Sequence, residues 1–130
     1  MFEFLKNLFE GNNFIQEENE ALIDLLLLAM YSDFHLAKEE EETLDEELLF
    51  MDWKSVHSQE DYVSASVIRA RDAVEDPVLT LAYLRVIAAR MTEPDFRKKA
   101  KESLYAVLKA DHQIDAEEEK FISLFKQVFG

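Results

Sequence analysis

Residues 16–32 read Gln-Glu-Glu-Asn-Glu-Ala-Leu-Ile-Asp-Leu-Leu-Leu-Leu-Ala-Met-Tyr-Ser, and they give the strongest signal for the fold class. Its four consecutive leucines, Leu25 to Leu28, would make a helix apolar nearly all round, which is typical of a central, buried helix. The apolar part, residues 21–31, is interrupted by Asp24. It is well short of the roughly 20 apolar residues that span a bilayer. The stretch therefore predicts the core helix of a globular domain and no transmembrane segment.

Helical signals continue on both sides of this stretch and predict an all-α fold. The chain has only two Gly and two Pro, so long helices joined by short loops fit better than a meander of short strands. Ser58 resembles an N-cap, and Pro77 and Pro94 each stand where a first helical residue is expected. The seven expected helices cover residues 2–10, 16–32, 38–55, 58–74, 77–91, 94–110 and 115–129.

The first of these helices carries an apolar stripe made of Phe2, Leu5 and Phe9. Its only basic side chain is Lys6, so we expect it to pack on the domain or on a second copy rather than lie on a membrane. A homo-oligomer formed through this N-terminal apolar helix is therefore one expectation.

The formal net charge of −14 comes from one segment. Between Glu10 and Asp61 there are 16 acidic residues and two Lys, whereas the rest of the chain has 12 acidic and 12 basic residues. Such a field repels nucleic acid and anionic lipid, and it favours a basic protein partner or metal ions. Solvated helix faces that keep the protein soluble are the alternative.

Motifs for catalysis and cofactor binding are missing from the sequence. Without Cys there are no disulfides or thiolate metal sites, and two glycines cannot build a phosphate-binding cradle. The three histidines, His35, His57 and His112, are scattered, and no Glu-x-x-His motif occurs. We therefore expect no enzymatic activity. With no Cys and no recognisable secretory signal, the expected localisation is cytoplasmic.

An acidic turn occurs twice, at matching positions of residues 26–41 and 104–119. Each copy reads as an apolar helix, an Asp, an apolar residue three positions later and a Glu seven positions after the Asp. The Asp can bond turn amides, and the acidic residues suit the first turn of the next helix. These positions are Asp33, Leu36 and Glu40 in the first copy and Asp111, Ile114 and Glu118 in the second.

These residues resemble the tellurite-resistance TerB family and its TerB-like relatives, whose pattern is roughly Ala-Asp-Gly-x-Ile-x-x-x-Glu after an apolar helix. Residues 110–118 read Ala-Asp-His-Gln-Ile-Asp-Ala-Glu-Glu, and residues 32–40 read Ser-Asp-Phe-His-Leu-Ala-Lys-Glu-Glu. His112 and Phe34 stand at the family's Gly. The resemblance covers nearly the whole chain. It implies one compact bundle of about seven helices over residues 1–130, cytoplasmic and non-enzymatic, with a role in stress or metal response.

The second acidic turn is the candidate metal site. Asp111, Gln113, Asp115 and Glu118 place three carboxylates and one amide oxygen within one turn. Oxygen ligands of this kind suit Ca²⁺, Mg²⁺ or Mn²⁺. The EF-hand pattern fails, because Ile122 holds the position of its bidentate Glu. Helix capping by Asp115 and Glu118 is the alternative. Weaker candidates in the first turn are Asp33 and Glu40.

Two functions remain open on the sequence. The first is a non-enzymatic interaction module that presents an acidic helical surface to a protein partner, and the second is a divalent-cation-binding protein that uses the acidic turns. A basic cluster at residues 97–101, with Arg97, Lys98, Lys99 and Lys101, is interpreted as a helix surface. A small phosphate site or an acidic-partner site is its alternative.

Overall fold

The computed structural model describes residues 16–32, 58–109 and 116–130, with the backbone alone at residues 59, 103, 106–109, 117 and 118. These ranges form helices and no strand, which confirms the all-α prediction for this part of the chain. The helices are Gln16–Tyr31 (α2), Gln59–Ala73 (α4), Pro77–Ala89 (α5), Pro94–Lys109 (α6) and Ala116–Phe129 (α7). The helices expected at 2–10 and 38–55, the first acidic turn and residues 111–115 of the second lie outside the described residues.

The helix ends follow the capping signals in the sequence. The Ser58 hydroxyl accepts the backbone N–H of Asp61 at 3.0 Å and so begins α4. The Asp76 side chain accepts the N–H of Val78 at 2.7 Å, with Pro at the start of α5. Gly130 follows α7 with φ +86°, the left-handed conformation in which a glycine commonly ends a helix. These interactions satisfy backbone groups that a helix end leaves free.

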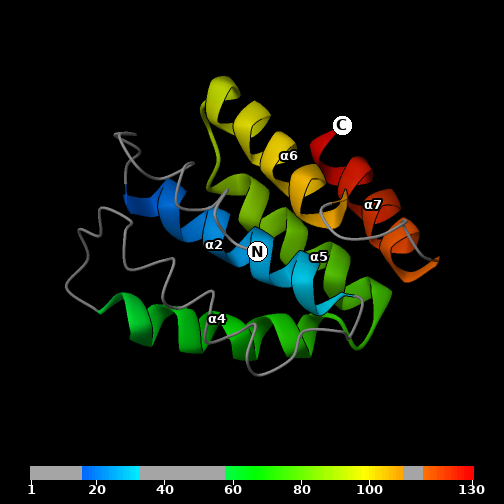
Figure 1. Ribbon diagram of the computed structural model, residues 1–130, viewed down its shortest axis with the longest axis horizontal. Helices are drawn as coiled ribbons and strands as arrows, with labels where there is room; N and C mark the ends of the chain where they lie inside the picture. Colours follow the sequence, from blue (N-terminus) through cyan, green and yellow to red (C-terminus); the bar gives the residue numbers. More distant parts are fainter. Residues whose placement is uncertain (1–15, 33–57, 110–115) are drawn as a thin grey trace.

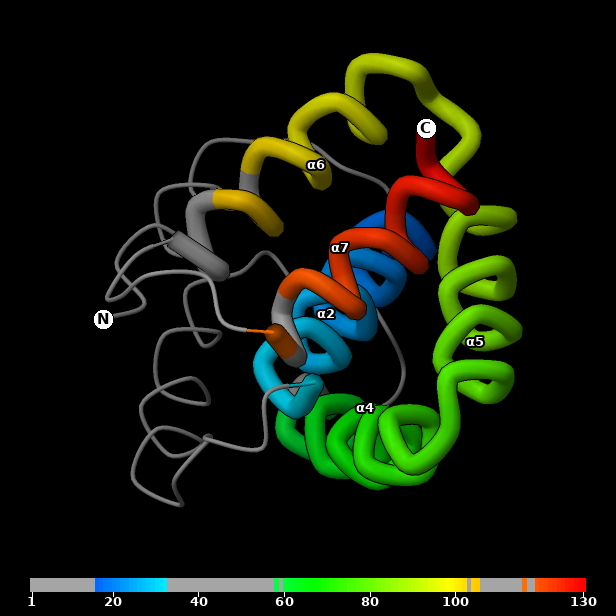
Figure 2. The backbone as a smooth tube through the Cα atoms, turned by 90° about the vertical axis from the view of Figure 1, so that its right-hand side faces the viewer, coloured from blue at the N-terminus to red at the C-terminus, as the bar shows by residue number. Residues whose placement is uncertain are grey.

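α2 is the centre of the described fold. It packs against α4, α5 and α6, and α7 packs against α5 (Figure 1). Figure 2 shows α2 with the other four helices arranged around it. Leu22, Leu25 and Leu28 are fully buried, and so are leucines on the remaining sides of α2. This burial on all sides confirms the prediction of a central helix. Each buried leucine side chain contributes about 1.5–3 kcal/mol to stability, so α2 organises the core.

The C-terminal helix is held by aromatic packing. The Phe125 ring is fully buried, meets Tyr105 of α6 edge-on at 6.2 Å and stacks on Phe129 at 4.5 Å. The Arg97 guanidinium lies 5.2 Å from the centre of the Phe129 ring, and the Lys101 ammonium donates to the carbonyl of the last residue at 3.0 Å. Part of the basic cluster on α6 therefore secures the end of the chain.

Candidate functional site

The predicted metal ligands fall almost entirely outside the described residues. Asp33, Glu40, Asp111 and Asp115 lie there, and Glu118 is placed by its backbone in the first turn of α7. Within residues 16–32, 58–109 and 116–130, no group of three or more His, Asp or Glu side chains is placed to hold a metal ion. The metal site of the second acidic turn stays a prediction.

The polar centre of the described structure is Asp24, in the middle of α2, with a side chain only 2% exposed. Its Oδ1 accepts from the Ser66 hydroxyl at 2.5 Å and from Nη2 of Arg69 at 2.9 Å. Its Oδ2 accepts from the Tyr62 hydroxyl at 2.8 Å and from Nη2 of Arg90 at 2.5 Å. The carboxylate thus receives four donors, two of them from guanidinium groups.

Three helices supply this Asp24 network. Tyr62, Ser66 and Arg69 are four and three residues apart, so they share one face of α4 and turn towards α2. Arg90 is the C-cap residue of α5. The Arg69 guanidinium also lies 5.3 Å from the centre of the Tyr62 ring and donates through Nε to the Tyr83 hydroxyl of α5 at 3.2 Å. The network therefore joins α2, α4 and α5 into one unit.

The chemistry of the Asp24 network is structural. An ionised carboxylate has about four acceptor positions, and all of those on Asp24 are used by the protein itself. With so little exposure, Asp24 can reach neither a metal ion nor a substrate proton. The network supports a role in fixing helix positions rather than in catalysis.

The pKa values of Tyr62 and Arg90 are shifted in the direction that keeps these donors protonated. Burial raises the pKa of the Tyr62 phenol above its usual range, and the negative charge of Asp24 adds to this effect. Burial lowers the pKa of Arg90, but the hydrogen bonds to Asp24 and Tyr62 outweigh burial and raise the pKa above its ordinary value. Both groups keep their protons at neutral pH, so Asp24 keeps its donors.

One signal in the sequence could have pointed to this network. Acidic side chains are almost never fully buried unless they are paired, and Asp24 is the single charge in a run of apolar residues predicted to be buried. That pattern predicts cationic partners on neighbouring helices. It does not say which ones, because the four partners lie 38 to 66 residues further along the chain.

The outer face of α4 has a different character from its inner face. Asp61, Ala65, Ile68 and Asp72 are exposed and lie along one stripe, opposite the buried side of the helix. Ile68 is 60% exposed. The Arg71 guanidinium beside the stripe lies 5.3 Å from the centre of the Tyr31 ring of α2. We call the four exposed residues Asp61, Ala65, Ile68 and Asp72 the α4 outer face.

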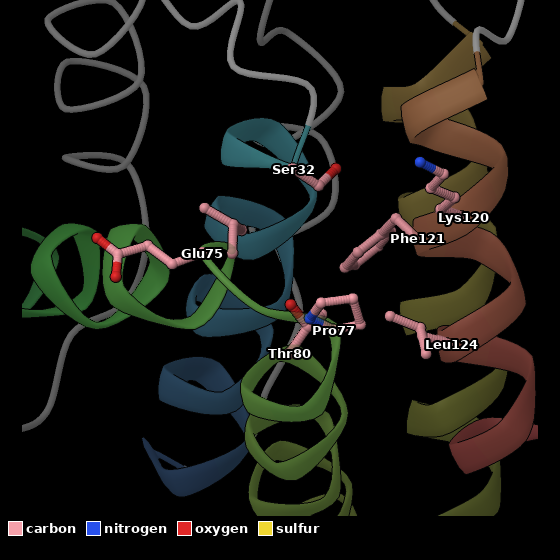
Figure 3. Close-up of a pocket in the computed structure, with 8 residues that line it drawn as sticks. Ser32, Glu75, Pro77, Thr80, Lys120, Phe121 and Leu124 are labelled. Atoms are coloured by element: carbon pink, nitrogen blue, oxygen red, sulfur yellow. The ribbon is translucent and has the colours of Figure 1, made fainter.

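A pocket of about 300 Å³ lies between the end of α2, the α4–α5 turn and α7 (Figure 3). Phe121 and Leu124 of α7 point towards the start of α5 and make this side of the pocket apolar. The Ser32 hydroxyl donates to a carbonyl one turn earlier at 2.6 Å, and the Thr80 hydroxyl donates to a carbonyl at the end of α4 at 2.7 Å. Both hydroxyls are engaged within the fold, so neither is poised as a nucleophile.

Comparison with known proteins finds nothing similar: no family model, no curated protein and no solved structure matches this chain. The resemblance to the TerB-like family therefore stays a prediction. None of the helices in the described ranges is long and apolar enough to cross a membrane.

Proposed function

We propose that this chain is a non-enzymatic interaction module that binds a basic segment of a protein partner through the α4 outer face. The observation that carries the proposal is Ile68, a large apolar side chain that is 60% exposed between two exposed carboxylates on one helical stripe. Aliphatic contact at the centre with charges around it is the usual composition of a protein-binding patch. A partner helix with an apolar residue between lysines or arginines has the complementary chemistry.

The electrostatics of α4 support an acidic docking role. Its first turn carries exposed Glu60 and Asp61, and its last turn is followed by exposed Glu75 and Asp76. Of the cations on this helix, Arg69 pairs with the buried Asp24, and Arg71 lies against Tyr31. These carboxylates add to the field of a chain with net charge −14, which attracts a basic partner from a distance.

The described polar groups also favour binding over catalysis. Asp24 has no acceptor position left, and the two hydroxyls in the pocket are hydrogen-bonded within the fold. The role in stress or metal response that the TerB-like resemblance implies forms part of the same proposal.

A capture experiment with matched variants tests the proposal. The purified chain is immobilised and exposed to lysate at about 50 mM and about 500 mM salt, and retained proteins are purified and titrated against the chain. We expect a basic protein that is retained at low salt and released at high salt, since the Debye length falls well below 10 Å at the higher concentration. The variants Ile68→Ser and Asp61→Asn/Asp72→Asn should each weaken its binding about tenfold or more.

The control for this experiment is Glu102→Gln/Glu119→Gln, which removes two exposed carboxylates from α6 and α7. It removes the same amount of negative charge as Asp61→Asn/Asp72→Asn and leaves the α4 outer face intact. A partner that binds all of these variants equally well would remove the α4 outer face from the proposal. A chain that retains no basic protein at low salt would overturn the proposal altogether.

A further inference from the structure

The outer side of α5 is the most apolar exposed surface in the described part of the chain. Three of the four large apolar side chains that are exposed there belong to α5, namely Val78 (72%), Leu79 (49%) and Val86 (57%). Ala82 and Ala89 are exposed as well. At about 100° per residue these positions fall within an arc of roughly 120°. The α5 outer face is therefore a continuous apolar strip along the helix.

This strip is also free of negative charge. The sequence of α5, Pro-Val-Leu-Thr-Leu-Ala-Tyr-Leu-Arg-Val-Ile-Ala-Ala, contains no acidic residue, whereas α2, α4, α6 and α7 each contain at least two. The one charged side chain within α5 is the exposed Arg85. The net charge of −14 comes from the segment between Glu10 and Asp61, so two copies repel each other most strongly through that segment. The α5 outer face itself therefore brings no carboxylate into a contact with a second copy.

We propose that a second copy of this chain covers the α5 outer face, with the two α5 helices antiparallel around a two-fold axis at Ala82. In this register Val78 of one copy faces Val86 of the other, and the same contact occurs twice by symmetry. The small side chain of Ala82 at the axis lets the two helices approach closely. Each copy thus contributes both Val78 and Val86 to the contact.

Charge complementarity selects this orientation over a parallel one. Glu75 and Asp76 are exposed just before the start of α5, and Arg85 lies in its C-terminal half. In the antiparallel register Arg85 stands opposite position 79 of the second copy. Glu75 of that copy lies in the turn just before α5, at the same end of the helix as position 79. A parallel pair would place Arg85 beside Arg85 instead.

Sedimentation of the purified full chain at about 1 µM to 1 mM tests for the dimer. A contact limited to one helix pair predicts a weak Kd, between about 10 µM and 1 mM. Val86→Glu should raise this Kd at least about tenfold, because two carboxylates then enter the apolar contact. The matched control Ser123→Glu adds the same charge at an exposed position of α7 and should change the Kd less than about threefold.

A mixing experiment tests the orientation. Arg85→Glu and Glu75→Lys should each weaken the dimer, because each brings like charges together twice. An equimolar mixture of the two variants should recover association to within about threefold of the wild type, since both contacts then join opposite charges. Circular dichroism checks that every variant keeps its helix content.

The outcomes separate clearly. A wild-type chain that is monomeric at about 1 mM overturns the proposal, and so does a dimer weakened equally by Val86→Glu and Ser123→Glu. A dimer that depends on Val86 but gains nothing in the mixture overturns the antiparallel arrangement. Selective weakening by Val86→Glu together with recovery in the mixture supports both parts.

Discussion

Asp24 places a carboxylate where its neighbours along α2 are fully buried leucines. Removing such a group from water costs several kcal/mol, and only well-placed partners offset this cost. Tyr62 and Arg90 meet one oxygen of Asp24, and Ser66 and Arg69 meet the other. Because these donors come from two other helices, the residue fixes how α4 and α5 sit against α2.

Replacing Asp24 with Asn should destabilise the fold strongly. The amide keeps the size of the side chain but removes its charge, and its NH2 group must face a guanidinium donor on one side. We expect a loss of about 3–5 kcal/mol in the free energy of unfolding, measured by urea denaturation. Asp72→Asn, at an exposed position of α4, should stay within about 0.5 kcal/mol of the wild type. A loss below about 1 kcal/mol for Asp24→Asn would show that the network does not hold the helices together.

Tyr62 should make the free energy of unfolding fall at alkaline pH. Its pKa is raised by burial and by the charge of Asp24, whereas the unfolded phenol ionises near about pH 10. The folded state therefore favours the neutral phenol, and its contribution is fully present below about pH 10 and is lost as the pH rises further. Tyr62→Phe should be less stable at pH 7 by about 1–3 kcal/mol, with a gap that narrows above about pH 10. Urea denaturation from pH 7 to 11 measures the gap, and a constant gap would contradict the prediction.

At the scale of the helices, capping residues set where each element begins. Ser58→Ala removes the acceptor for the N–H of Asp61 at the start of α4. We expect a loss of about 1 kcal/mol, within the range of about 0.5–2 kcal/mol for N-cap substitutions, measured by thermal or urea denaturation. Ser64→Ala, at an exposed position inside the same helix, should be neutral or slightly stabilising. Equal effects of the two substitutions would mean that α4 does not depend on this cap.

The starts of the helices were easier to predict than the polar contacts between helices, because the two depend on interactions over different sequence separations. Caps and apolar periodicity act within a few residues, so the sequence predicts the start of α4 after Ser58 and of α5 after Asp76, as observed. The Asp24 network forms between residues 38 to 66 positions apart, and no local pattern specifies such a pairing. The acidic turn at 33–41 and residues 111–115 of the second turn lie outside the described residues, so the metal site predicted there stays a prediction.

At the scale of the whole molecule, net charge should give the two proposed surfaces opposite responses to salt. The α4 outer face attracts a basic partner through unlike charges, so added salt should weaken that complex. Two copies meeting at α5 each carry a net charge of −14, so salt should strengthen their association by screening the repulsion between them.

The ion pairs proposed between Arg85 and Glu75 do not reverse this expectation. Exposed pairs contribute only about 0–1 kcal/mol each, whereas the full net charge of both molecules takes part in the repulsion between them. Sedimentation at about 20 mM and about 200 mM salt should therefore show a tighter dimer at the higher concentration, while the same change weakens the partner complex. A dimer that weakens with salt as steeply as the partner complex would mean that many opposite charges meet in the self-association contact, which contradicts a contact made mainly of the apolar side chains of α5.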